Sequence, residues 1–187
     1  MKQKKVMTSL NELLKEGYPL REEKPTPPYK IYCDMDGVLT DFEKRFEHFT
    51  GMHPQEYEKA KGLPAFWHLI DVEIGVKFWV GMDYMPQGEQ LWNFIRNYQP
   101  DLLTSPSRDN TSRLGKNLWV KNNLNPKPKV IFAYSKAKSR YANENSILID
   151  DKPSNINEWA SKGGIAIRCK NGNVDHVIEK LKELGYE

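Results

Sequence analysis

Few cysteines and no long apolar run are the first features of this sequence of 187 residues. The only two cysteines, Cys33 and Cys169, are expected to be small buried residues in a reducing compartment, without a disulfide. No uninterrupted apolar stretch approaches the roughly 20 residues of a membrane span. The first residues lack the apolar segment of a signal peptide. We therefore expect a cytoplasmic protein that does not bind membranes.

Several catalytic and metal-binding motifs are also missing. There is no glycine-rich phosphate loop, no Cys/His cluster and no serine nucleophile elbow, so kinase, zinc-site and serine-hydrolase chemistry have no support. The four histidines lack the spacing of metal ligands, and we expect them at surface or satisfied core positions. With 39% hydrophobic and 28% charged residues, the composition is that of an ordinary globular domain.

The alternation of strand and helix patterns predicts an α/β fold after a short appendage. In residues 1–28, Ser9 and Glu12 form a capping box that predicts a helix over about 10–16, and a proline-rich tether follows. From Tyr29 onward, the pattern favours a Rossmann-like, doubly wound parallel sheet of about five strands. Strands are predicted at 29–33, 101–104, 129–133, 146–150 and 164–168, and helices at about 88–98, 111–123, 137–143, 154–161 and 173–184.

One long interval interrupts this alternation. Residues 42–87 contain no convincing strand, only short helical stretches separated by glycine and proline. The interval is too long for a simple loop in a compact domain, so it must have structure of its own. We predict a small helical cap at 42–87, inserted after the first strand, and a catalytic core formed by residues 29–41 and 88–187.

Paired acids end two of the predicted strands. Asp34 and Asp36 follow strand 29–33, and Asp150 and Asp151 stand at the end of the fourth strand. The carboxyl ends of parallel strands meet at the edge where open α/β folds bind ligands, and residues i and i+2 of an extended chain point the same way. Carboxylates in this arrangement predict a divalent-cation site. Taken alone, the first pair is more typical of a turn and the second of a helix cap.

Four segments, in order, resemble the motifs of haloacid dehalogenase-like phosphohydrolases. They are Asp34-Met35-Asp36-Gly37-Val38-Leu39, then Leu102-Leu103-Thr104-Ser105-Pro106, a lysine at Lys136 or Lys138, and Ile149-Asp150-Asp151. Within that superfamily, they are most similar to the 5'(3')-deoxyribonucleotidases and their phage and bacterial relatives. The resemblance covers about residues 29–167 and implies Mg²⁺ as cofactor.

The acids have expected roles in this chemistry. Asp34 is the expected nucleophile, which forms an aspartyl-phosphate, and Asp36 is the expected general acid and base. The metal ligands are expected to be Asp34, Asp36 through its backbone carbonyl as the resemblance implies, Asp150 and Asp151. Of the last two, Asp150 is favoured, with Asp151 as a second ligand or an orienting acid.

Other residues are expected to hold the phosphate. Thr104 and the amide of Ser105 can donate hydrogen bonds to it. A lysine must offset the charge of the aspartyl-phosphate, and Lys138 fits slightly better than Lys136. Ser107 is expected to cap the following helix.

A basic block and a group of aromatic residues suggest what the site recognises. Residues 108–140 hold nine basic side chains and one acid, which favours phosphate or nucleic-acid partners about as well as a solvated helix face. Within the block, Lys116 could add charge to the site, but we expect Lys116 to be a solvated helix residue. Most aromatic residues of 42–87 are expected to pack the cap. Those expected in the substrate pocket are Phe42, then Phe66, Trp67 and Trp79.

The sequence thus predicts a Mg²⁺-dependent phosphomonoesterase, with a 5'-nucleotidase acting on (deoxy)ribonucleoside monophosphates as the first hypothesis. The basic block favours a phosphatase of polynucleotide 3' ends as an alternative. A non-catalytic nucleotide-binding protein with the same fold is a third hypothesis.

Overall fold

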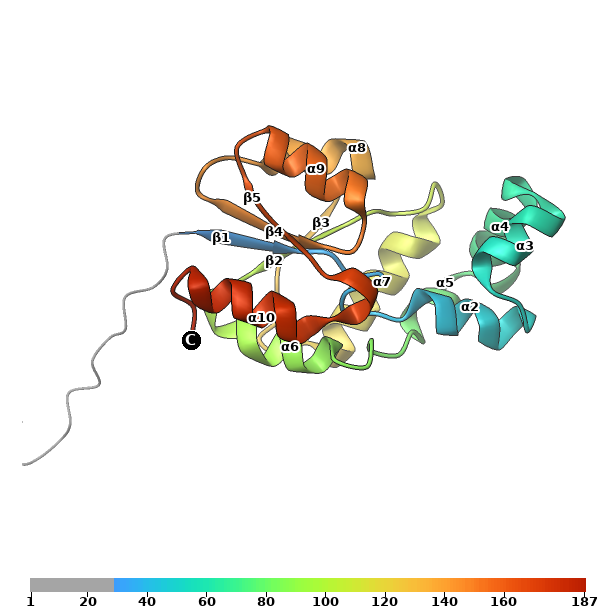
Figure 1. The fold of residues 1–187 in the computed structure, drawn as a ribbon. Helices are drawn as coiled ribbons and strands as arrows, with labels where there is room; N and C mark the ends of the chain where they lie inside the picture. The colour runs from blue at the N-terminus through green and yellow to red at the C-terminus, as the bar shows by residue number, and fades with distance from the viewer. Residues whose placement is uncertain (1–28) are drawn as a thin grey trace, which may run out of the picture.

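The computed structural model describes residues 29–187, so the predicted helix at about 10–16 and the proline-rich tether lie outside the described residues. Five parallel strands form one sheet in the order β3-β2-β1-β4-β5 (Figure 1). The predicted α/β fold is therefore confirmed, and each strand begins and ends within one residue of its expected position. The strands are β1 (Lys30–Cys33), β2 (Asp101–Thr104), β3 (Val130–Phe132), β4 (Ser146–Asp150) and β5 (Ile165–Arg168).

Helices cover both faces of the sheet. Helices α6 and α10 lie side by side on one face, together with α7, and α8 and α9 lie on the other (Figure 1). None of the helices within residues 29–187 has both the length and the apolar character needed to cross a membrane. Their bounds are α6 (Gly88–Ile95), α7 (Asn110–Asn123), α8 (Ser135–Lys138), α9 (Pro153–Ser161) and α10 (Val174–Glu183), with 3-10 turns at Arg96–Tyr98, Ser139–Tyr141 and Lys170–Gly172.

The apolar character of the strands follows from this double cover. Successive side chains of a strand point to opposite faces, so a parallel strand between two helix layers is apolar along its length. In β4, Ile147 and Ile149 join the larger core beneath α6, α7 and α10, whereas Leu148 joins a smaller core with Trp159 of α9. Both cysteines are free and buried, and Cys33 is part of the larger core.

Short helices occupy the interval between β1 and α6, at one side of the sheet (Figure 1). Helix α5 packs against α7, where Gly115 leaves space for the Trp79 side chain. Asp41 caps α2 by accepting a 2.9 Å hydrogen bond from the Lys44 amide. We propose that this interval is the cap. Its elements are α2 (Phe42–Thr50), α3 (Pro54–Lys61), α4 (Leu63–His68), a π-helical turn (Leu69–Ile74) and α5 (Val76–Val80).

Candidate active site

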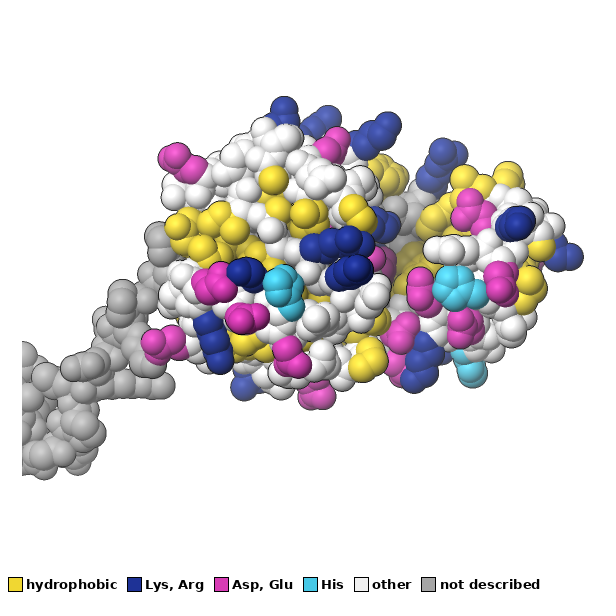
Figure 2. Space-filling model, viewed as in Figure 1, with side chains coloured by type: hydrophobic (Ala, Val, Ile, Leu, Met, Phe, Trp, Pro, Cys, Tyr) yellow, Lys and Arg dark blue, Asp and Glu magenta, His cyan; other side chains and the backbone are white. Residues whose placement is uncertain are grey.

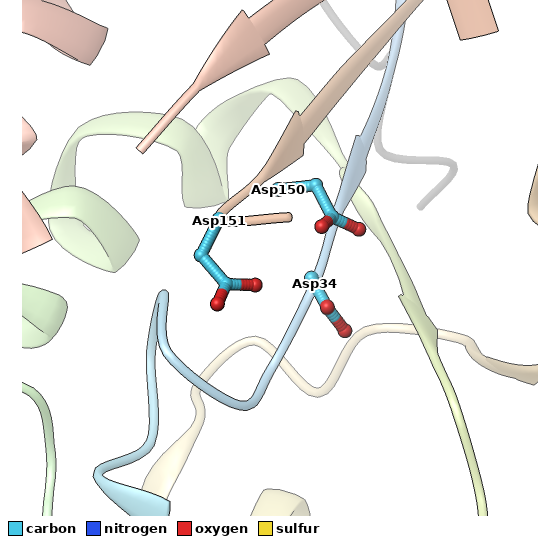
Figure 3. Close-up of side chains that lie close together, drawn as sticks. All are labelled: Asp34, Asp150 and Asp151. Carbon is cyan, nitrogen blue, oxygen red and sulfur yellow. The ribbon is translucent and has the colours of Figure 1, made fainter. Parts of the chain in front are cut away.

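Three carboxylates converge at the carboxyl edge of the sheet. Asp34 directly follows β1, Asp150 ends β4 and Asp151 comes next, and Figure 3 shows their side chains close together. One oxygen from each lies within 4.8 Å of the others. The adjacent strands β1 and β4 create this convergence, because Cys33 is paired with Ile149 in the sheet and the acids follow both.

The electrostatics of the cluster differ from one acid to the next. Burial and then the charges of Asp34 and Asp150 raise the pKa of Asp151 to about 7. Burial and repulsion from Asp34 raise the pKa of Asp150 to about 6, despite the nearby Lys138. Burial would raise the pKa of Asp34 as well, but the charge and hydrogen bond of Lys138 outweigh it, and the pKa of Asp34 is lowered. Asp34 is therefore the acid of this cluster most readily ionised.

The donor set fits a divalent cation. Among residues 29–187, the buried Asp151 Oδ1 has no hydrogen-bond partner, although a buried oxygen without a partner is costly. Hard cations such as Mg²⁺ prefer carboxylate oxygens, and a bound cation would compensate both this oxygen and the repulsion among the three acids. The oxygens of Asp34 and Asp150, in contrast, already have partners among protein groups, and Asp150 has the larger number of them.

Lys138 joins two of the acids. Its Nζ lies 2.7 Å from Asp34 Oδ2 and 2.7 Å from Asp150 Oδ2, and the side chain is 1% exposed. Burial would lower the pKa of Lys138, but the two carboxylates raise it well above its ordinary value, so the ammonium is charged. Lys136, on the same short helix, is exposed. Of the two predicted lysines, the structure places Lys138 in the cluster.

Lys116 contradicts the expectation of a solvated helix residue. It is completely buried, because its position on α7 falls on the face that packs inward with Gly115 and Trp119. Its Nζ donates hydrogen bonds to Asp36 Oδ2 at 2.6 Å and to Thr104 Oγ1 at 2.8 Å. A third, also 2.8 Å long, goes to the backbone carbonyl of Ser105. Lys116 lies three residues before Trp119, so the two side chains share one face of the helix. This spacing indicated burial, but the charge of the lysine favoured an exposed position.

Asn155 is a site residue that sequence reasoning missed. From the first turns of α9, its side-chain amide donates to both oxygens of Asp150, at 3.0 and 2.9 Å. The Lys152 amide adds a 2.9 Å hydrogen bond to Asp150 Oδ1. Together with Lys138, these donors hold Asp150 in place. No sequence motif distinguishes this asparagine from an ordinary helix residue.

Ser107 does not cap α7, contrary to expectation. Asp109 does, by accepting a 2.8 Å hydrogen bond from the Thr111 amide. The Ser107 hydroxyl instead donates to Asp71 Oδ1 at 2.7 Å, which links the β2–α7 loop to the π-helical turn. Burial raises the pKa of Asp71. The aspartate is the better cap here because Ser107 lies three residues before the helix begins.

A cavity of about 850 Å³ borders the cluster: Asp151 and the neighbouring Asp36 line it, whereas Asp34 and Asp150 lie behind its wall. All four aromatic residues expected in the substrate pocket line it. They are not equally available, since Phe66 and Trp79 are 5% and 1% exposed, whereas Trp67 is 37% exposed. Phe42 contacts the rings of Phe46, Phe66, Phe78 and Trp79.

The remaining predicted residues lie nearby. Thr104 ends β2 and is completely buried behind Lys116. Ser105 lines the cavity, and its hydroxyl donates to the Ala133 carbonyl at 3.2 Å. In the basic block 108–140, Lys116 and Lys138 are buried within the site, which leaves seven of the nine basic residues for any external partner.

The comparisons with known proteins bear on the fold. No protein-family model matches the sequence. No curated protein matches it significantly. Among solved structures, a "predicted phosphatase" from Clostridium acetobutylicum is similar, with a TM-score of 0.50 and 12% identity over 84% of this chain and 91% of that one. A dehalogenase with an intermediate complex is similar at a TM-score of 0.50 and 10% identity, over 77% and 85% of the two chains. The chain thus shares the α/β fold of these proteins.

Proposed function

We propose that this protein is a Mg²⁺-dependent phosphomonoesterase with Asp34 as the nucleophile. The observation that carries the proposal is the cluster of Asp34, Asp150 and Asp151, with an unpartnered buried oxygen on Asp151, at the ligand-binding edge of the sheet. Two buried lysines adjoin this cluster and the neighbouring Asp36. A site that combines carboxylates with fixed ammonium groups suits phosphoryl transfer, which depends mainly on positioning and charge neutralisation.

Asp34, Asp151 and the Asp36 carbonyl would hold the magnesium ion. Asp150 was the favoured ligand from the sequence, but its oxygens are engaged by Lys138, Asn155 and the Lys152 amide. We therefore propose Asp151 as the principal ligand from this strand, with Asp150 orienting the cluster. When bound, Mg²⁺ supplies positive charge that reduces repulsion between a carboxylate and a phosphate dianion.

The protein groups can carry out both half-reactions. The ionised Asp34 attacks phosphorus, and the ester oxygen leaves with a proton from the Asp36 carboxyl group. Asp36 lines the cavity, so it can reach this oxygen. It then removes a proton from a water molecule, which attacks the aspartyl-phosphate and releases phosphate and Asp34. Lys116 and Thr40 hold Asp36 through hydrogen bonds of 2.6 and 3.1 Å.

A nucleoside monophosphate is the substrate that the cavity favours. The cavity volume of about 850 Å³ lies within the range of small-molecule sites. Trp67 is partly exposed on the cavity wall, and stacking of a base on an aromatic ring contributes about 1–3 kcal/mol. The proposed cap covers the site, which suits a small substrate and the exclusion of water.

A panel of ribo- and deoxyribonucleoside 5'- and 3'-monophosphates, assayed with Mg²⁺ and with EDTA, tests this proposal. We expect phosphate release from 5'-monophosphates that EDTA abolishes. Asp101→Asn provides a matched control, since Asp101 pairs with Lys30 at the opposite end of β2. Absence of release from every member of the panel, despite nucleotide binding, would favour the non-catalytic alternative.

The polynucleotide-end alternative has its own test. A 3'-phosphorylated oligonucleotide should be a poor substrate, because the proposed cap side of the cavity carries Glu43 and Glu58. Steep loss of oligonucleotide hydrolysis with rising salt, together with faster turnover than for mononucleotides, would favour that alternative instead.

A further inference from the structure

Two basic side chains of the cavity have no role in the proposed reaction. Lys152 and Arg168 both line its core side, which is the side formed by residues 29–41 and 88–187. Arg168 ends β5, where it is paired with Asp150 of β4, and its Nε donates a 3.1 Å hydrogen bond to the Asp151 carbonyl. This bond anchors the guanidinium group beside the carboxylate cluster and leaves its two terminal nitrogens for another partner.

Neither side chain forms a salt bridge within residues 29–187, although Lys152 lies close enough to Asp151 for its charge to lower the pKa of that acid. Within residues 29–187, no ion pair includes Lys152 or Arg168, and the terminal nitrogens of Arg168 have no hydrogen-bond partner. A guanidinium group held at one nitrogen is well suited to bind an oxyanion through the others. The Asp151 carboxylate nearby is already proposed as a metal ligand, so it does not compete for this arginine.

The opposite wall directs an anion to this place. Glu43 and Glu58 line the side of the cavity that the proposed cap contributes. Figure 2 shows Lys, Arg, Asp and Glu side chains on both lobes. A negatively charged substituent of a bound substrate is therefore repelled from the cap side, and on the core side it is attracted by Arg168 and Lys152 rather than by Asp36 and Asp151.

The loop after β5 shapes the same side of the cavity. Asn171 and Gly172 both line it, and both have positive φ values, 53° and 70°. A non-glycine residue in this conformation is uncommon and is found most often at turns and ligand sites. The loop thus places the amide side chain of Asn171, and the backbone of Gly172 without a side chain, on the same side of the cavity as Arg168.

We propose that Arg168 and Lys152 form a second anion subsite, which binds a phosphoryl group of the substrate other than the one that is hydrolysed. This inference rests on the proposed function, which assigns the scissile phosphate to Asp34. The substrate class that fits is a nucleoside bisphosphate, with the second phosphoryl group directed to the core side of the cavity. The next phosphate of a short 5'-phosphorylated oligonucleotide presents the same chemistry.

Calorimetric titration of the full chain tests the subsite in proteins that all carry Asp34→Asn, so that no probe is hydrolysed; wild type here denotes Asp34→Asn with Arg168 and Arg113 unchanged. The probes are deoxyadenosine 3',5'-bisphosphate, 5'-phosphorylated deoxyadenosine dinucleotide and dAMP, each with Mg²⁺. We expect the bisphosphate to bind at least about tenfold more tightly than dAMP, as for one added charge-assisted contact. In Arg168→Met this ratio should fall to within about threefold, with Arg168→Lys in between. Arg113→Met, which alters an arginine outside the cavity, should retain the ratio of the wild type.

The possible results separate the two proposals. If the dinucleotide shows the larger Arg168-dependent gain in affinity over dAMP, the subsite recognises the second phosphoryl group of a nucleic-acid end. If the bisphosphate shows the larger gain, the subsite recognises the second phosphoryl group of a mononucleotide. Equal affinities of wild-type protein for all three probes, an unchanged ratio in Arg168→Met, or no binding would overturn the subsite. Failure of the proposed function instead appears as absence of Mg²⁺-dependent phosphate release, whatever the ratio of affinities.

Discussion

Individual residues determine the chemistry at the edge of the sheet. Asp34 and Asp151 lie close together, yet Lys138 lowers the pKa of the first while burial raises the pKa of the second. Acids with such different environments can take different roles in one reaction. Asp34 then suits the nucleophile, and Asp151 suits a metal ligand that releases its proton when a cation binds.

Removal of the nucleophile tests the first role. Asp34→Asn should lower phosphatase activity by about 10³-fold or more, since no covalent intermediate can form. The circular dichroism spectrum should remain that of the wild type, because the amide has the same shape as the carboxylate. Asp101→Asn is the control, and activity in Asp34→Asn close to that of the control would refute the assignment.

Magnesium binding should depend on pH through Asp150 and Asp151. In the absence of metal, their pKa values of about 6 and about 7 exceed the ordinary value of an aspartate. The folded protein therefore holds these protons more tightly than the unfolded chain, and this contribution to stability is lost as pH rises from about 4 to about 7. Mg²⁺ requires the deprotonated acids, so its stabilising effect should grow over the same interval.

Thermal unfolding measured at pH 5, 6, 7 and 8, with Mg²⁺ and with EDTA, checks this dependence. The increase in Tm on adding Mg²⁺ should be larger at pH 8 than at pH 5 in the wild type. It should be much smaller at every pH in Asp151→Asn. An increase that does not change with pH, or that survives this substitution in full, would contradict the metal site.

Lys116 offers a test based on stability. Lys116→Met leaves Asp36 without its buried partner, and loss of one member of a buried pair costs about 3–5 kcal/mol. Because the Asp36 side chain is 28% exposed, we expect a smaller loss than this, about 2–3 kcal/mol, in urea unfolding. Lys121→Met changes an exposed lysine of the same helix and should cost less than about 0.5 kcal/mol. Equal stabilities of the two variants would show that Lys116 is solvated.

At the scale of elements, the strands were predictable and several helix contacts were not. Short β-rich runs end at Thr104, at Asp150 and just before Asp34. These residues indicate both where the strands end and where the site lies, because the carboxyl ends of parallel strands lie at the same edge of the sheet. The burial of Lys116 depends on how α7 packs against α5, and the pairing of Ser107 with Asp71 joins residues 36 positions apart. Such contacts between distant elements leave no local pattern in the sequence.

The contact between α5 and α7 leads to a prediction at this scale. Gly115 lies so close to Trp79 that an added side chain would force the two helices apart. Gly115→Val should lower the free energy of unfolding by about 1–3 kcal/mol through overpacking. Asn117→Val places the same residue at an exposed position of α7 and should cost less than about 1 kcal/mol. Similar losses of unfolding free energy in both variants would show that helix propensity, and not packing, causes the effect.

At the scale of the whole molecule, the sheet carries the chemistry and the short helices beside it shape the cavity. The core side of the cavity carries Lys152 and Arg168 beside Asp36 and Asp151, whereas the charged residues on the cap side, Glu43 and Glu58, are both acidic. The sequence does not reveal this distribution, because its members are scattered along the chain.

A crystal structure of the protein with Mg²⁺ and BeF₃⁻ tests the central claim most directly. The claim predicts beryllofluoride bound to an oxygen of Asp34 and a magnesium ion that contacts Asp34, Asp151 and the Asp36 carbonyl. Lys116 and Lys138 should remain within hydrogen-bond distance of the site. A cluster that stays without either ion at saturating concentrations, or a fluoride complex on another residue, would contradict it.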